Sequence, residues 1–313
     1  MELLFIIDPP DALKAYKDTT VAMMRAAQAR NHTVHVCEAS SLAWRDGVVA
    51  AECLHIALTD NDEDWYRPHG HAGRALASFG AVLMRKDPPF DLEYVTSTWL
   101  LSAAERVGAR VFTAPGAVRD HNEKIAIAEF PQFVAPTLVT REPGRVHAFI
   151  DEQQDVVLKR LDVMGGENIF RVRADDPNRN VIVEIMAQGG TRSLMAQRFI
   201  PEIRDGDKRI LLIEGEAVPW SLARIPTAGE TRGNLAAGGR GVAQPLSARD
   251  REIATHIGPT LAARGLLLVG LDVIGDYLTE VNITSPTCFR EIQDQSGFDV
   301  AGMFLAALEG KLR

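Results

Sequence analysis

Residues 265–282 read Gly-Leu-Leu-Leu-Val-Gly-Leu-Asp-Val-Ile-Gly-Asp-Tyr-Leu-Thr-Glu-Val-Asn, and this stretch decides the fold. Two apolar, β-rich runs, 266–274 and 277–281, lie on either side of the dipeptide Gly275-Asp276. A Gly-Asp pair between such runs is typical of the tight turn that joins two antiparallel strands. The stretch therefore predicts a β-hairpin late in the chain.

Carboxylate and amide oxygens are spaced along both predicted strands. Asp272 lies on the first strand, and Glu280 and Asn282 share one face of the second because side chains alternate along a strand. Oxygen ligands without a nearby His or Cys suit a hard cation such as Mg²⁺. The competing interpretation is strand-end carboxylates that are exposed to solvent or paired with arginine. The apolar setting of all three residues favours a metal site.

Composition limits the classes of protein to consider. A chain of 313 residues indicates two or three domains, and a net charge of −8 argues against general nucleic-acid binding. Cys37, Cys53 and Cys288 are scattered without metal spacing, which is typical of reduced thiols in a cytoplasmic protein. Neither a signal peptide nor an apolar run of membrane-spanning length is present, so no membrane partner is expected.

The N-terminal third alternates between short apolar runs and helical patterns. Strands are predicted at 3–7, 33–37, 80–84 and 110–112, and helices at 18–30 and 92–108. This alternation predicts a small open parallel sheet with helices on its faces. Lys17 and Arg85 occur in polar clusters near strand ends, where such sheets hold ligands, and the two cations suit a carboxylate-bearing small molecule. A solvated, salt-bridged loop is the alternative for each cluster.

Two glycine-rich segments follow further along the chain. The pair Gly165-Gly166, close after Lys159 on a predicted strand, could let backbone N–H groups approach a phosphate, although an ordinary turn has the same composition. The loop at 227–241 is poor in large apolar residues but carries Arg232 and Asn234. We interpret it as a lid over an anionic site, with disorder lacking function as the alternative.

Several unusual strings in separate regions carry a resemblance to a known family. They are Met84-Arg-Lys-Asp-Pro-Pro-Phe90, Asn122-Glu-Lys124, Asp205-Gly-Asp-Lys-Arg209, Gly229-Glu-Thr-Arg-Gly-Asn-Leu-Ala-Ala-Gly-Gly-Arg240, Val269-Gly-Leu-Asp272 and Asn282-Ile-Thr-Ser-Pro-Thr287. With these strings the chain resembles the prokaryotic-type glutathione synthetases of the ATP-grasp superfamily over nearly its whole length. Arg160 and Val163 depart from the family pattern, in which Pro and Gly are common at these places.

The resemblance implies an α/β and α+β protein, with an N-terminal open parallel α/β (pre-ATP-grasp) domain followed by a two-lobed ATP-grasp fold. The expected domains are 1–119 for substrate binding, 120–200 for the ATP-grasp lid or small lobe, and 201–313 for the catalytic lobe. It also implies a cytoplasmic homo-oligomer that binds ATP with Mg²⁺, Mn²⁺ being the alternative metal.

The resemblance further implies a role for particular residues, which are grouped here by expected ligand. ATP is expected to contact Lys124, Lys159, Met164, Gly165, Gly166, Gln197, Arg198, Phe199, Ile200 and Asp207. The metal is expected on Asp272, Glu280 and Asn282, and the substrates on Lys17, Arg85, Asn234, Ser285 and Thr287. Catalytic charge neutralisation is expected from Arg209, Arg224 and Arg232.

The implied reaction is the ATP-dependent ligation of γ-glutamylcysteine to glycine through an acyl phosphate, giving glutathione, ADP and phosphate. One alternative is another ATP-grasp carboxylate–amine ligase, against which the strings 85–90 and 230–240 argue. The other is a non-catalytic ATP-binding module, in which we would expect the metal carboxylates to be lost. Phosphate release that depends on both γ-glutamylcysteine and glycine would distinguish an enzyme from such a module.

Overall fold

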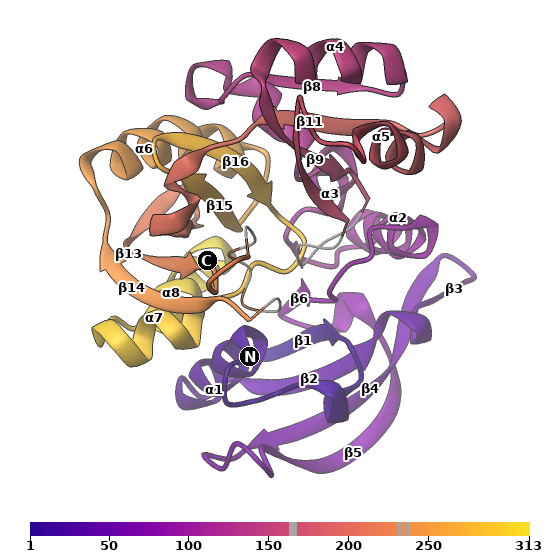
Figure 1. The fold of residues 1–313 in the computed structure, drawn as a ribbon. Helices are drawn as coiled ribbons and strands as arrows, with labels where there is room; N and C mark the ends of the chain where they lie inside the picture. Colours follow the sequence, from indigo (N-terminus) through magenta and orange to yellow (C-terminus); the bar gives the residue numbers. More distant parts are fainter. Residues whose placement is uncertain (163–167, 231–232, 234, 236–237) are drawn as a thin grey trace.

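The computed structural model describes residues 1–162, 168–230, 233, 235 and 238–313, and the chain forms three β-sheets with helices around them (Figure 1). The sheets follow one another along the chain. They have seven, four and five strands.

The first sheet consists of β1 (Glu2–Ile7), β2 (Thr33–Glu38), β3 (Ala43–Arg45), β4 (Val48–Leu58), β5 (Tyr66–Ala75), β6 (Ala81–Met84) and β7 (Val111–Phe112). Strands β2, β1, β6 and β7 run parallel, as the alternation of strands and helices predicts. Strands β3, β4 and β5 extend this core in antiparallel fashion, so the sheet is mixed rather than purely parallel. The β3–β4 hairpin turns at Asp46-Gly47.

Three helices accompany this sheet: α1 (Thr19–Ala29), α2 (Leu92–Arg106) and α3 (Pro115–Asp120). Both long helices begin at an aspartate that accepts a hydrogen bond from a backbone N–H of the first turn, Asp18 from Val21 at 2.8 Å and Asp91 from Tyr94 at 2.9 Å. Such capping satisfies amide groups that have no partner within the helix.

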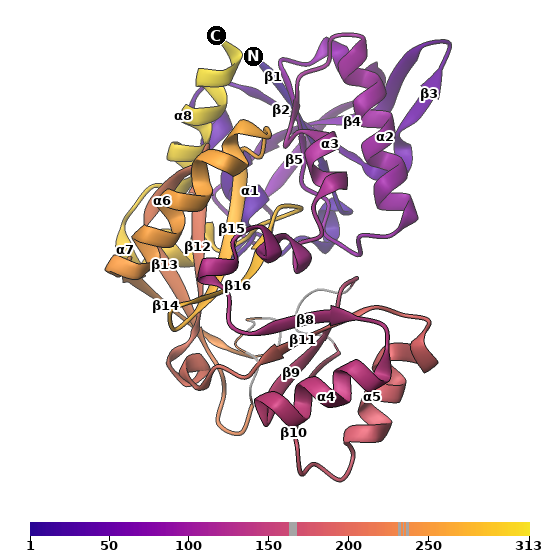
Figure 2. The same cartoon turned by 90° about the horizontal axis from the view of Figure 1, so that it is seen from above.

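The second sheet forms a small lobe with its own apolar core. It contains β8 (Thr137–Thr140), β9 (Asp155–Arg160), β10 (Ile169–Arg173) and β11 (Leu194–Arg198), with α4 (Pro143–Gln153) and α5 (Arg179–Ala187). Strands β9 and β10 are antiparallel neighbours, and β9 also pairs with β11. Figure 2 shows this lobe projecting from the rest of the molecule, with both helices on its outer side.

The third sheet has the order β14-β13-β12-β15-β16. Its strands are β12 (Asp207–Ile213), β13 (Glu216–Ile225), β14 (Arg240–Pro245), β15 (Leu268–Ile274) and β16 (Tyr277–Asn282). The last two form the predicted hairpin, in which Ile274 pairs with Tyr277 across the turn.

Both faces of the third sheet are covered. One packs on α6 (Ala248–Ala263) and on the 3₁₀ turns at 125–133. The other joins a core shared with α7 (Phe289–Ser296), α8 (Val300–Leu312) and the first sheet. This shared core fixes the first and third sheets relative to each other.

The C-terminal helix α8 packs beside α1 (Figure 2). Glu309 on α8 contacts the residues that follow α1, because Arg30 donates to its Oε2 at 3.0 Å and His32 Nε2 lies 2.9 Å from its Oε1.

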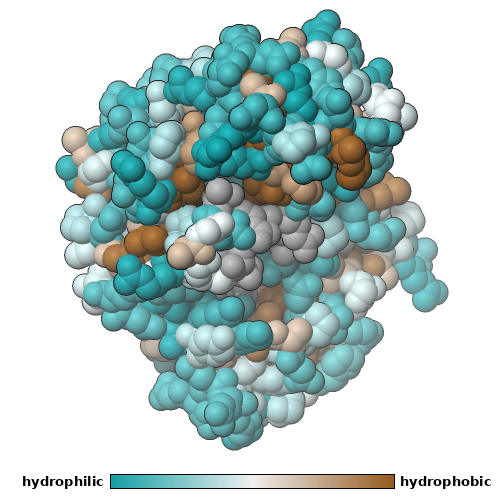
Figure 3. Space-filling view, in the orientation of Figure 1, coloured by the Kyte–Doolittle hydropathy of each residue, from teal (hydrophilic) through white to brown (hydrophobic). Residues whose placement is uncertain are grey.

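The face in Figure 3 is mainly hydrophilic, and its hydrophobic residues occur in small separate groups. Within the described residues, no helix is both long enough and apolar enough to cross a membrane.

Candidate active site

Strand register brings the predicted metal ligands together on one face of the third sheet. Asp272 on β15 lies directly across from Glu280 on β16 and from Arg209 on β12. Gly270 pairs with Asn282, so this amide lies beside Glu280 on the same face. The hairpin thus aligns two carboxylates and an amide, as the sequence predicts.

Two more charged residues extend this face on the neighbouring strands. Asp207 pairs with Arg224 of β13, and Asp207 shares the face of Arg209 because the two are separated by one residue. Opposite charges therefore alternate across the sheet from β13 to β15.

Asp207, Arg209, Arg224 and Asp272 form a buried ion cluster. Arg209 donates to the two oxygens of Asp272 at 2.6 and 3.1 Å. Arg224 Nη2 lies 2.9 Å from Asp272 Oδ2 and donates to Asp207 Oδ2 at 2.5 Å. Burial alone would raise the pKa of Asp272, but the attraction of both arginines outweighs it and holds that pKa well below its usual range. Both oxygens of the Asp272 carboxylate are thus in contact with arginine.

A glycine makes room for this cluster. A Cβ on Gly270 would lie 2.8 Å from Cδ of Arg209 and 3.1 Å from its Nε. Because real Cβ atoms do not come so close, any side chain here would displace the arginine that pairs with Asp272. In the string Val269-Gly-Leu-Asp272, Gly270 therefore leaves the space that Arg209 needs to pair with Asp272.

Two lysines face the acidic end of the hairpin from other parts of the chain. Lys124 precedes the 3₁₀ turn Ile125–Glu129, and its Nζ donates to Oε1 of Glu280 at 3.0 Å. Lys159 on β9 donates to Oε1 of Gln197 at 3.0 Å. Burial lowers the pKa of Lys159, and Glu280 is foremost among the groups that raise it, so the lysine lies within electrostatic reach of that carboxylate.

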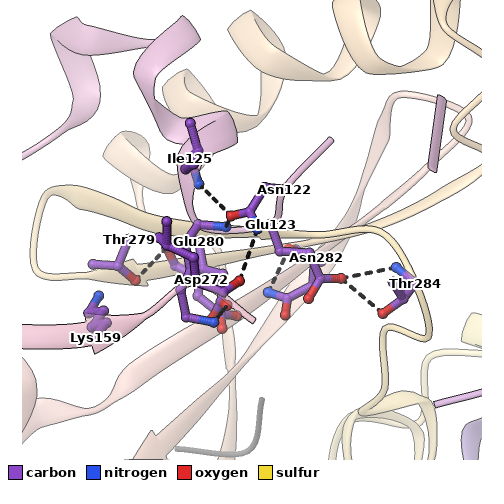
Figure 4. A network of polar contacts seen from close by, with 12 residues as sticks. Asn122, Glu123, Ile125, Lys159, Asp272, Thr279, Glu280, Asn282 and Thr284 are labelled. Atoms are coloured by element: carbon purple, nitrogen blue, oxygen red, sulfur yellow. Dashed lines mark hydrogen bonds and ion pairs between the residues drawn. The ribbon is translucent and has the colours of Figure 1, made fainter. Parts of the chain in front are cut away.

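Of the three predicted metal ligands, Glu280 and Asn282 offer side-chain oxygens to a cation, whereas both Asp272 oxygens contact arginine. The amide nitrogen of Asn282 donates to the Gly270 carbonyl at 3.2 Å, which leaves the side-chain oxygen as its ligand atom. Figure 4 shows Asp272, Glu280 and Asn282 gathered beside residues 122–125. Among the described residues, no group of three or more His, Cys, Asp or Glu side chains is arranged to hold a metal. A carboxylate and an amide with water and phosphate as further ligands suit Mg²⁺.

Residues 197–200, which are expected to contact ATP, begin the connection from the small lobe to the third sheet. Their side chains mostly bind protein groups: Gln197 donates to Thr137 Oγ1 at 2.9 Å, and Arg198 donates to the Tyr277 hydroxyl at 3.1 Å. Phe199 is covered by the Arg171 guanidinium 3.5 Å from its ring centre, and Ile200 is buried. A nucleotide held here would therefore meet backbone and apolar surface rather than free polar side chains.

The predicted substrate residues lie at the junction of the first sheet with residues 284–287. Arg85 is buried, and it donates to the Pro286 carbonyl at 2.9 Å and to Thr20 Oγ1 at 3.1 Å. Ser285 donates to the Arg85 carbonyl at 3.3 Å. Thr287 is exposed, and so is Lys17, whose ammonium lies 5.9 Å from the Tyr16 ring centre. Arg85 thus connects the first turn of α1 to residues 284–287 through hydrogen bonds, whereas Lys17 and Thr287 lie at the surface.

Some predicted site residues fall outside the described part of the chain. They are Met164, Gly165, Gly166, Arg232 and Asn234. Gly233 is described and lies against the ion cluster, since a Cβ there would come within 2.3 Å of the Arg224 carbonyl and 3.1 Å of Asp207 Cβ.

A small pocket brings together residues that lie far apart in the sequence. It is lined by Pro88, Phe90, His121, Asn122, Glu123, Lys124, Leu161, Asp162 and Thr284.

Glu123 occurs in one of the strings that carry the family resemblance, but the sequence predicted no role for it. Burial, and then the nearby Glu280 carboxylate, raise the pKa of Glu123. No local signal pointed to a role, because another acidic residue, Asp120, lies close by in the sequence and the hydrogen-bond partners of Glu123 lie far along the chain.

Two family models match the chain. The model of the prokaryotic glutathione synthetase N-terminal domain matches residues 1–119, and that of the prokaryotic glutathione synthetase ATP-grasp domain matches residues 123–297. Together they span most of the sequence.

Curated relatives are similar over nearly the whole chain. A glutathione synthetase of Ralstonia nicotianae is 60% identical over 309 residues, covering 99% of this chain and 95% of the relative. One of Pseudomonas aeruginosa is 48% identical, covering 100% of this chain and 98% of the relative. Among solved structures, a D-cycloserine synthetase has a TM-score of 0.67 at 15% identity, covering 100% of both chains. An ATP-grasp protein of Sphaerobacter thermophilus with a RimK domain has a TM-score of 0.63 at 18% identity, covering 98% of this chain and 99% of that one. At these identities the solved structures demonstrate a shared fold.

Proposed function

The chain belongs to the prokaryotic glutathione synthetase family, and we propose how the residues around the β15–β16 hairpin carry out the ATP-dependent ligation of γ-glutamylcysteine to glycine. The proposal depends chiefly on one observation. Lys124, which pairs with Glu280, and Lys159 come from different parts of the chain and lie near the Asp272 ion cluster on the β15–β16 hairpin (Figure 4).

The chemical problem is the leaving group. A carboxylate at neutral pH cannot release oxide, so the cysteinyl carboxylate of the dipeptide attacks the γ-phosphorus of ATP, which forms a carboxyl–phosphate bond and releases ADP. The glycine amine then attacks the acyl carbon, phosphate leaves, and the amine loses a proton. Phosphoryl transfer of this kind requires positioning and charge neutralisation more than covalent participation of the protein.

We propose that Glu280 and Asn282 hold a divalent cation, Mg²⁺ or alternatively Mn²⁺, with Asp272 nearby. When bound, such a cation neutralises phosphate oxygens and keeps them in line for transfer. Asp272 contributes mainly through its two arginines, because both of its oxygens contact them.

Cationic side chains supply the remaining positive charge. Lys124 and Lys159 would contact the ATP phosphates, each exchanging its present partner, Glu280 or Gln197, for a phosphate oxygen. Arg209 and Arg224 would face the acyl phosphate and the oxyanion that forms when glycine attacks. Their pairing with Asp272 holds them at the sheet face before the substrates bind, so little reorganisation is required during reaction.

Water would hydrolyse the acyl phosphate, so the site must close during turnover. We propose that residues 164–166 and the loop carrying Arg232 and Asn234 cover it, which the position of Gly233 against Arg224 supports. The division into 1–119, 120–200 and 201–313 remains a proposal, as do Lys17, Arg85, Ser285 and Thr287 as dipeptide contacts. Homo-oligomerisation and a cytoplasmic location also remain predictions.

The test replaces the two proposed metal ligands. Glu280→Gln and Asn282→Ala should each lower kcat by about 10²–10³-fold, because each removes a preorganised electrostatic contact to the reacting phosphates. Phosphate release should require both γ-glutamylcysteine and glycine in the wild type. The matched control is Glu252→Gln, which changes an exposed glutamate on α6 that pairs with Arg249. Near-normal turnover in either ligand variant would contradict the assignment.

A further inference from the structure

The segment of residues 283–288, here called the strap, connects the metal edge of the third sheet to α7. It has no helix or strand structure, yet Ile283, Thr284 and Cys288 are 1%, 7% and 1% exposed. Buried backbone groups must find partners, and outside regular structure these partners are usually side chains. The question is therefore which side chains hold the strap.

One carboxylate oxygen holds the first half of the strap. Glu123 Oε1 accepts hydrogen bonds from the backbone N–H of Ile283 at 2.8 Å, from the backbone N–H of Thr284 at 3.0 Å, and from Thr284 Oγ1 at 2.9 Å (Figure 4). The backbone carbonyl of Glu123 also accepts from the N–H of Val281, on β16 itself, at 2.8 Å. The residue thus contacts both sides of Asn282 along the chain.

The second half of the strap is held by Arg85, which directly follows β6 of the first sheet and donates to the Pro286 carbonyl at 2.9 Å. Just beyond the strap, Phe289 N–H donates to Thr19 Oγ1 of α1 at 3.2 Å. The two halves therefore have anchors of opposite charge on separate parts of the molecule. Glu123 is the anchor beside the metal edge, and Arg85 is the anchor beside the first sheet.

We propose that Glu123 is a positioning residue, which holds the strap through its carboxylate oxygen and thereby fixes Asn282 and Glu280 at the geometry required by a divalent cation. This inference depends on the proposed function, in which those two residues are the metal ligands. The next residue, Lys124, donates to Glu280 at 3.0 Å, so the same segment contacts the chain on both sides of Asn282 as well as Glu280 itself. Displacements of about 1 Å in a ligand atom are enough to impair such a site.

Removal of the Glu123 carboxylate would leave the polar groups of the strap without their acceptor. Two buried N–H groups and a hydroxyl would lose their shared acceptor, and a buried donor without a partner is strongly unfavourable. The strap would relieve this by moving toward water, and the end of β16 would move with it. A side chain that keeps an acceptor oxygen at the same place should prevent this movement.

The experiment compares Glu123→Gln, which keeps a side-chain carbonyl oxygen, with Glu123→Ala, which removes it. Mn²⁺ binding in the presence of ADP is measured from the electron paramagnetic resonance signal of free Mn²⁺, and kcat and KM are measured for ATP and for γ-glutamylcysteine. We expect Glu123→Ala to weaken Mn²⁺ binding at least tenfold and to lower kcat at least thirtyfold. Glu123→Gln should restore both quantities to within about threefold of the wild type.

Two further variants complete the design. Thr284→Val removes one of the three donors and should weaken Mn²⁺ binding by a smaller factor, two- to fivefold, even if Glu123→Ala does not fold. Glu129→Ala is the matched control, because Glu129 lies on the following 3₁₀ turn and pairs with Arg264 at the surface. It should leave Mn²⁺ binding unchanged.

Unchanged Mn²⁺ binding in folded Glu123→Ala would overturn the inference, and so would unchanged binding in Thr284→Val. Loss of binding in Glu123→Gln as severe as in Glu123→Ala would also overturn it, because the carboxylate would then act by charge or as a ligand itself. Glu280→Gln separates the two proposals. If that variant binds Mn²⁺ normally, the metal assignment fails; if it loses Mn²⁺ while Glu123→Ala does not, only the positioning role fails.

Discussion

Replacement of Asp272 by Asn should destabilise the protein even without metal or nucleotide. The Asp272 carboxylate lies 2.6 Å from Arg209 Nε and 2.9 Å from Arg224 Nη2, and it is 2% exposed. At about 3 Å and an effective dielectric constant of about 20, one such attraction amounts to about 5 kcal/mol before desolvation is considered. Removal of one partner from a buried ion pair destabilises proteins by about 3–5 kcal/mol.

The lower end of that range is expected here. Asn keeps one acceptor oxygen, and Arg224 keeps its contact with Asp207 at 2.5 Å. About 3 kcal/mol corresponds to a fall in the melting temperature of about 6–12 °C for a domain of 150–250 residues. Differential scanning calorimetry in EDTA measures this fall without interference from a bound cation.

The control for this substitution is Asp151→Asn, because Asp151 pairs with Arg179 but its side chain is 61% exposed. That variant should melt at the wild-type temperature, since exposed ion pairs contribute little. A fall of less than about 2 °C for Asp272→Asn would refute the structural role of the cluster. Addition of MgADP to the same samples then measures any direct contact between Asp272 and the cation, as a loss of ligand-induced stabilisation.

Three other predictions address separate features. Gly270→Ala should displace Arg209, because the new Cβ would lie 2.8 Å from the arginine Cδ, and kcat should fall at least tenfold while circular dichroism stays unchanged; wild-type turnover would contradict this. Arg74 donates to Glu2 and lowers the pKa of that carboxyl to about 2, so the pair stabilises the fold above pH 4.5 and loses this effect as the pH falls toward 2. Glu2→Gln should therefore have a lower urea midpoint than the wild type at pH 7 and an equal one near pH 2, and a constant difference would exclude the linkage. Arg232→Ala should uncouple ATP hydrolysis from peptide formation, seen as excess phosphate over glutathione, whereas a ratio of one would remove the lid role.

The late hairpin was predictable because its signals are local. The dipeptide Gly275-Asp276 specifies the turn, and Ile274 pairs with Tyr277 across it as expected. A register shift between Asp272 and Val273, which the turn signal does not predict, then places Asp272 opposite Glu280. The helix that begins after Ser247 was predictable for the same reason, since Ser247 accepts from the Asp250 N–H at 3.1 Å and the Asp250 carboxylate accepts from the Ser247 N–H at 2.9 Å.

Strand β5 was not predicted, because it lacks the pattern on which such predictions depend. Its sequence Tyr-Arg-Pro-His-Gly-His-Ala-Gly-Arg-Ala has no alternation of apolar and polar residues, and it is mostly exposed on both faces. It is a strand only through its pairing with β4. A strand that buries neither face leaves no hydrophobic period in the sequence.

The ion cluster could not be derived from sequence either. Arg209 and Arg224 were expected near the reacting groups, but their pairing with Asp272 requires β12 to lie between β13 and β15. Strand order is a property of the folded sheet, and local patterns do not encode it. Glu123 was overlooked for a related reason, because its partners lie 160 and 161 residues further along the chain.

The most direct test of the metal assignment is anomalous diffraction from crystals grown with Mn²⁺ and a non-hydrolysable ATP analogue. We expect a Mn²⁺ peak within direct coordination distance of a Glu280 carboxylate oxygen and of the Asn282 side-chain oxygen, with phosphate oxygens among its other ligands. Lys124 and Lys159 should contact the same phosphates. A peak that touches neither Glu280 nor Asn282, or phosphates bound away from both lysines, would contradict the account.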